Sequence, residues 1–292
     1  SSTGEFGECF TAMSSNKLRV SRVHGNINNP DYSLIINVVD GEKTSEGELP
    51  EWLDWWKGSY VPLISDDDPL MEKASRKMYE KYIHIAGVLG LDYAGTNPGA
   101  VFRDQFDKKV KGIEVYLKHM KELQHLAKEK GLKAFNIEPM SSLAEPPTTP
   151  DEMDYMIGSL NDYHEQHKDS TVPVWLCGDI SHGLADEHKQ VVYSNIELFE
   201  HGIPMMSEFH FKNTDEIFNS TFGFSDAEIK KGIIDLSEIR DICENNKSKW
   251  PVEEVVGYLE IGGPKIGRDY SDPMLGEALR TSLRAIKKIF YS

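Results

Sequence analysis

The 292-residue sequence has few basic residues and few cysteines. Its 32 Lys and Arg residues are outnumbered by 48 Asp and Glu residues, which gives a formal net charge of −16. Nucleic-acid binding requires a basic surface that releases counterions, and anionic membranes attract basic segments, so the charge argues against both partners. The composition is that of a soluble globular protein and not of a disordered chain, and a local basic pocket for one small phosphate stays compatible with it.

Other features are missing as well. No apolar run reaches about 18 residues and no signal peptide is evident, so the sequence predicts neither a transmembrane helix nor secretion. The three cysteines, Cys9, Cys177 and Cys243, are far apart and form no C-x-x-C pair, which excludes zinc-finger chemistry. Their odd number favours reduced thiols and a cytoplasmic location.

From residue 70 onward, helical and strand patterns alternate without a break. Apolar residues recur at helical spacing over 70–89 and 103–129, with a short strand between these helices. Further strands are predicted at 132–140, 172–179, 203–211, 232–236 and 255–263, and further helices at 149–167, 187–202, 237–246 and 272–290. Such alternation implies parallel strands joined by right-handed crossovers. We therefore predict an α/β fold, a single (β/α)8 TIM-barrel domain over 1–292, whose first two units are irregular or partly missing.

Four chemically active residues lie where predicted strands end. These are Glu138, Asp179, His210 and Glu260. In a parallel barrel all these strand ends meet on one face, which is the catalytic face. One acidic residue at a strand end is more often a helix cap, and a lone histidine is more often a packed side chain. Four such residues, each at the end of a different predicted strand, indicate a functional site.

Three carboxylates cannot lie close together in a partly buried site without a cation. A set of three acidic residues and one imidazole suits Mn²⁺, Mg²⁺ or Co²⁺, and Zn²⁺ is compatible with it. Such a metal would polarise a carbonyl as a Lewis acid, and carboxylates on each side could move a proton at the neighbouring carbon.

The segments "NIEPM", "GDISH", "SEFHFKNTD" and "YLEIGGPKIGRDYSDP" resemble the xylose-isomerase-like TIM-barrel superfamily. Within it they resemble the branch of ketose 3-epimerases and sugar-phosphate isomerases and epimerases, over about residues 75–290. The resemblance implies that Glu138, Asp179, His210 and Glu260 bind one divalent metal ion. It also implies that Glu138 and Glu260 act as the acid and base, and that the chain forms a dimer or tetramer.

The resemblance further implies substrate-binding residues. His182, in the Asp-x-x-His motif with Asp179, is one of them, and Glu145 is the candidate for a second glutamate that contacts substrate. Lys212 lies two residues after His210, so on a strand both side chains point to the same side. It could reach a substrate oxygen or a phosphate. Arg268, just past the last strand, suits a phosphate or carboxylate, or else a salt bridge to a neighbouring aspartate.

Other residues give weaker signals, and each also has an ordinary structural explanation. They are Lys265 as a further basic contact, the helix-spaced Trp52, Trp55 and Trp56 as a lid or subunit contact, the solvated run Asp66–Asp68, and His24 and Asn26 at the end of an early strand.

The leading functional hypothesis is a metal-dependent sugar isomerase that works through a cis-enediolate, with 3-epimerisation of a ketose or ketose phosphate favoured. Aldose–ketose isomerisation uses the same ligands and stays open, as does an inosose-dehydratase-like lyase. Phosphodiester cleavage on this fold needs more histidines and is opposed by the charge. A non-enzymatic sugar-binding barrel would require an incomplete site.

Overall fold

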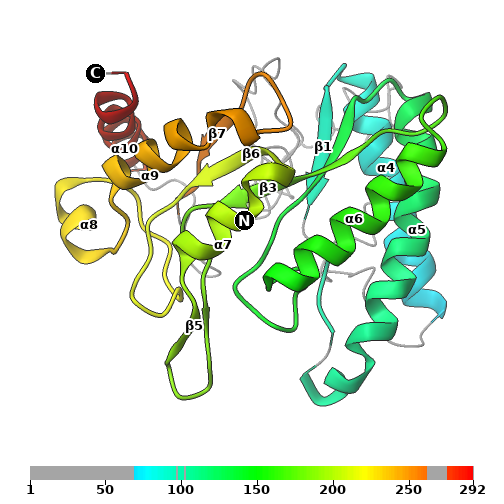
Figure 1. Ribbon diagram of the computed structural model, residues 1–292, viewed down its shortest axis with the longest axis horizontal. Coiled ribbons are helices and arrows are strands. Elements are labelled where there is room, and N and C mark those ends of the chain that lie inside the picture. Colours follow the sequence, from blue (N-terminus) through cyan, green and yellow to red (C-terminus); the bar gives the residue numbers. More distant parts are fainter. Residues whose placement is uncertain (1–68, 97, 102, 262–274, 292) are drawn as a thin grey trace, which may run out of the picture. The chain divides into compact units, whose positions relative to one another are not determined.

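The computed structural model describes residues 69–292 except 97, 102, 262–274 and 292 (Figure 1). The chain divides into two compact units. The first holds the described residues up to Ile137 together with Gly158–Val174, and the second holds Glu138–Ile157 with the described residues from Trp175 onward. The single domain predicted over 1–292 stays a prediction. No helix in the described ranges is long and apolar enough to cross a membrane.

Helices and strands alternate along the described chain. The α-helices are α4 (Pro69–Val88), α5 (Lys109–Glu129), α6 (Pro150–Gln166), α7 (Asn195–Gly202), α8 (Asp226–Lys231), α9 (Leu236–Asn245) and α10 (Leu275–Phe290). The strands are β1 (Tyr93–Thr96), β2 (Ala134–Ile137), β3 (Val174–Asp179), β4 (Leu184–Ala185), β5 (Val191–Tyr193), β6 (Met206–Phe211) and β7 (Val256–Leu259). Short 3-10 turns occupy Arg103–Lys108, Ile203–Met205 and Lys247–Lys249.

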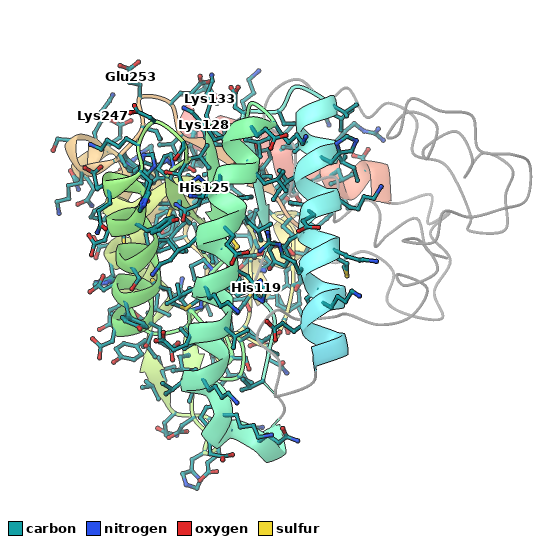
Figure 2. All side chains as sticks on the ribbon, turned by 90° about the vertical axis from the view of Figure 1, so that its right-hand side faces the viewer. His119, His125, Lys128, Lys133, Lys247 and Glu253 are labelled. Atoms are coloured by element: carbon teal, nitrogen blue, oxygen red, sulfur yellow. The ribbon has the colours of Figure 1, made fainter. Side chains whose placement is uncertain are left out.

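In the first unit, β1 pairs in parallel with β2, and α4 packs against α5. Figure 2 shows His119, His125 and Lys128 along α5. The His119 Nε2 atom lies 2.7 Å from the Glu72 carboxylate on α4, which ties the two helices together on their polar side. Gly131, at a φ of 87°, ends α5 in the left-handed conformation that glycine adopts most readily.

In the second unit, β6 pairs in parallel with both β3 and β7. The register between β3 and β6 shifts, because Leu176 pairs with Met206 while Cys177 pairs with Glu208. Ser207 is thus an extra residue on β6, as in a β-bulge, and it changes which side chains of β6 share a face with those of β3. After this bulge, Asp179 and His210 face the same side of the sheet.

Two predicted helices are wrong in part. The helix predicted over 103–129 is broken, because Gln105 has a non-helical backbone and only α5 continues as an α-helix. Val110, one of the apolar residues at helical spacing that predict a buried face for this helix, is 72% exposed. The helix predicted over 187–202 begins only at Asn195, because Ser194 caps it with a capping box to Glu197. The residues before the cap form β5, which pairs antiparallel with β4 in a hairpin.

The strand predicted at 232–236 is absent from the described sheet. Gly232 follows the short helix α8, which the sequence did not predict, and α9 begins at Leu236. The segment between them is held by the end of β6, since Asn213 accepts a hydrogen bond from the Ile234 amide at 3.1 Å. Five parallel strands are therefore described, rather than the six units predicted after residue 70.

Replacing Asn213 by alanine is expected to lower the free energy of unfolding by about 3 kcal/mol. Its side chain is fully buried, accepts from the amides of Thr214 and Ile234, and donates to the Glu228 carbonyl. The substitution leaves the Thr214 and Ile234 amides without this acceptor, while the Glu228 carbonyl keeps the Gly232 amide as a donor. Urea unfolding measures the effect. The control is Asn246→Ala, because Asn246 is partly exposed and its side chain donates to the Ile242 carbonyl; this variant is expected to lose less than about 1 kcal/mol.

Stability is also expected to depend on pH through Glu228. Partial burial raises its pKa, but hydrogen bonds from Ser225 and from the Gly223 amide outweigh burial and hold the pKa below its usual range. Its stabilising contribution is therefore complete above the unfolded-state pKa of about 4.3 and is lost as pH falls through the lower folded-state value. The stability difference between wild type and Glu228→Gln should shrink below about pH 4 in urea titrations. A difference that grows on acidification would contradict this assignment.

Candidate metal centre

Glu138, Asp179, His210 and Glu260, the four predicted ligands, come together in the second unit. Glu138 directly follows β2, Asp179 ends β3, His210 lies near the end of β6, and Glu260 directly follows β7. One ligand atom from each residue lies within 4.8 Å of all the others. Their convergence is what a shared register at the carboxyl ends of parallel strands predicts.

The distances within this cluster fit one small divalent cation. His210 Nδ1 lies 3.2 Å from Glu138 Oε1 and 3.2 Å from Glu260 Oε2, and 3.9 Å from Asp179 Oδ2. Neighbouring ligands on an octahedron with bonds of about 2.1 Å are about 3.0 Å apart, and opposite ones about 4.2 Å. Three carboxylates and one imidazole are the donors that hard or borderline divalent ions prefer. The residues therefore fit such an ion.

Lys212 lies inside the cluster. Its Nζ atom is 2.6 Å from Asp179 Oδ2 and 3.1 Å from Glu260 Oε2, and its side chain is 8% exposed. Burial alone would lower the Lys212 pKa, but the charges of Asp179 and Glu260 outweigh it and raise the pKa above its usual range. The amine is therefore a fixed positive charge that neutralises part of the carboxylate cluster.

The same charges act on the carboxylates. Burial would raise the pKa of Asp179, whose side chain is fully buried, but His182 and Lys212 hold it below its usual range. Burial would also raise the pKa of Glu260, but a hydrogen bond from His210 and the charge of Lys212 hold that pKa below its usual range. Both groups are thus ionised at neutral pH, as ligands of a cation must be.

The structure places the other predicted residues unequally. His182 lies beside the cluster: its Nε2 atom is 3.3 Å from Asp179 Oδ2 and 2.9 Å from Lys212 Nζ, and its Nδ1 atom is 2.7 Å from the Pro139 carbonyl. Glu145 lies in the loop between β2 and α6, where its backbone bonds to Ser142. Its role with substrate stays a prediction. The following lie outside the described residues: His24, Asn26, Trp52, Trp55, Trp56, Asp66–Asp68, Lys265 and Arg268.

The sequence interpretation missed two residues near the site. Cys177 Sγ lies 3.4 Å from His210 Nε2, and burial raises the pKa of this thiol to about 12. Glu208 is buried and pairs in register with Cys177. The two-residue period of a strand was a usable signal, because Cys177 precedes Asp179 by two positions and Glu208 precedes His210 by two.

Comparison with known proteins identifies the fold. No family model and no curated protein sequence matches the chain. A candidate xylose isomerase from Rhodospirillum rubrum has a similar structure, with a TM-score of 0.59 and 15% identity over 80% of this chain and 73% of the other. D-psicose 3-epimerase from Clostridium cellulolyticum, solved with D-tagatose, gives a TM-score of 0.56 and 14% identity over 80% and 76%. The predicted α/β TIM-barrel fold is confirmed.

Proposed function

We propose that this chain is a divalent-metal-dependent sugar isomerase whose favoured reaction is 3-epimerisation of a ketose. The observation that carries the proposal is the cluster of Glu138, Asp179, His210 and Glu260, with ligand atoms within 4.8 Å of one another at the strand ends. The likeness of the fold to D-psicose 3-epimerase supports it. Mn²⁺ is the proposed ion, with Mg²⁺ and Co²⁺ as substitutes.

The proposed roles divide acid–base chemistry and substrate binding among the predicted site residues. When bound, the ion supplies a Lewis acid that polarises the ketose carbonyl and makes the neighbouring C–H bond acidic. One of Glu138 and Glu260 removes the C3 proton to give a cis-enediolate, and the other returns a proton on the opposite face. His182 and Lys212 hold substrate oxygens, and Glu145 and Arg268 are proposed as further substrate contacts.

A neutral ketose is favoured over a ketose phosphate. Lys212 is already paired with Asp179 and Glu260, so it is poorly suited to neutralise a phosphate group as well. The net charge of −16 also opposes the approach of an anion. We further propose that the protein works in the cytoplasm as a homo-oligomer, a dimer or tetramer.

Deuterium exchange tests the proposed function. The metal-free chain is loaded with Mn²⁺ and incubated in D₂O with a panel of ketoses that includes D-psicose, D-tagatose and D-fructose. Deuterium at C3 with formation of the 3-epimer is expected, and a chelator should abolish it. Exchange with an aldose product would instead identify aldose–ketose isomerisation, and an enone or diketone absorbance would identify the lyase. No metal-dependent exchange across a broad panel would refute the proposal.

A further inference from the structure

One buried side chain beside the metal cluster has no role in the proposed chemistry. Cys177 is 7% exposed, and its Sγ atom lies 3.4 Å from Nε2 of His210. The opposite ring nitrogen, Nδ1, faces the carboxylates of Glu138 and Glu260 at 3.2 Å each. The two nitrogens of His210 therefore meet different partners, with sulfur on one side and the cluster on the other.

The β-bulge at Ser207 creates this contact. Because of the register shift, Cys177 pairs with Glu208 and Asp179 pairs with His210, so both pairs face the same side of the sheet. Cys177 therefore lies one layer below Asp179 on that face. From there its thiol reaches the Nε2 edge of the His210 ring.

The proton positions on the ring follow from the chemistry of imidazole. A neutral imidazole carries one N–H, and the nitrogen that binds a cation must offer its lone pair. When a metal ion is bound at Nδ1, the nitrogen that faces the carboxylates, the proton of the neutral ring lies on Nε2. The Nε2–H group then needs an acceptor, because a buried N–H without one is destabilising by about 1–3 kcal/mol.

We propose that Cys177 is a positioning residue for His210, whose Nε2–H donates to the Cys177 sulfur so that Nδ1 is held toward the metal ion. The inference rests on the proposed metal-dependent function. In other metal sites this outer partner of the histidine is a carboxylate, a carbonyl or water. A thiol is a weaker and uncharged acceptor, so it fixes the ring without adding a fourth negative charge to the cluster.

The test compares three variants of the full chain. Cys177→Ala removes the acceptor, Cys177→Ser replaces it with a hydroxyl, and Cys243→Ala removes the other described cysteine, which lies on α9. Mn²⁺ binding to the metal-free proteins is measured by calorimetry. We expect Cys177→Ala to weaken Mn²⁺ binding about tenfold, and Cys177→Ser and Cys243→Ala to stay within about threefold of wild type.

A spectroscopic readout separates positioning from general loss of structure. The visible absorption of Co²⁺ reports its ligand field, so the bands of the Co²⁺-loaded protein should shift in Cys177→Ala and return toward wild type in Cys177→Ser. Wild-type affinity and an unchanged spectrum in Cys177→Ala would overturn the inference and leave the proposed function intact. A wild-type chain that binds neither Mn²⁺ nor Co²⁺ would overturn the proposed function itself.

Discussion

Glutamine in place of Glu138 or of Glu260 is expected to lower kcat at least about 10³-fold. General acid–base catalysis by one positioned group contributes about 10²–10⁴-fold, and each glutamate is also a proposed metal ligand. Glutamine keeps nearly the same size and one carbonyl oxygen, so the change removes the charge and the ability to carry a proton. The effect should appear in both epimer formation and deuterium exchange at C3.

A Glu→Gln change elsewhere provides the matched control. Glu187, at the β4–β5 hairpin, has a side chain that is 87% exposed and lies 3.6 Å from His188. Glu187→Gln is expected to keep the wild-type kcat. Full activity in either Glu138→Gln or Glu260→Gln would show that the two carboxylates are not the acid and base, even if the chain proves to be an epimerase.

Methionine in place of Lys212 is expected to destabilise the metal-free protein by about 3 kcal/mol, because removing one partner of a buried ion pair leaves an uncompensated charge. The uncompensated charge would be that of Asp179, since its side chain is fully buried and lies 2.6 Å from the lysine nitrogen. Methionine preserves most of the side-chain volume, so loss of charge dominates over loss of packing.

Metal binding should reduce this deficit. An excess of Mn²⁺ supplies positive charge to the same carboxylates and stabilises the folded state by mass action, so the gap between Lys212→Met and wild type in urea unfolding should narrow. The control is Lys168→Met, since Lys168 forms an exposed pair with Glu165 and should lose less than about 1 kcal/mol. Equal stability of Lys212→Met and wild type without metal would contradict the assignment, and so would a deficit that Mn²⁺ leaves unchanged.

The sequence predicted the site best where an acidic residue or a histidine lies at the end of a predicted strand. Glu138, Asp179, His210 and Glu260 could be predicted as one cluster, because parallel strands bring their carboxyl ends to one edge whatever the details of packing. The helix predicted over 187–202 failed for a local reason: the Ser194 capping box fixes the helix start, and the apolar residues before it pair across a hairpin.

Contacts that depend on register could not be predicted in the same way. The short apolar segment 232–236 satisfies the pattern of a buried strand, yet the Ile233 and Ile234 amides donate to Thr214 and Asn213, just after β6, rather than to a described strand. The contact between Cys177 and His210 depends on the extra residue at Ser207, and no local pattern marks that position as a bulge. The predictions for the first 68 residues and for Arg268 lie outside the described residues.

The bulge at Ser207 has a consequence for protein engineering. Before it, Met206 lies against Gly178 and Gly202 on the side of the sheet that packs on α7, and beyond it Glu208 and His210 occupy the opposite side. If the segment Met206–Phe211 were paired with β3 in regular register from Leu176 and Met206, Phe209 would lie opposite Asp179 and His210 would point to the other side of the sheet. A β6 segment transplanted from this chain would therefore have to keep its bulge at Ser207, although that residue is not one of the four predicted ligands.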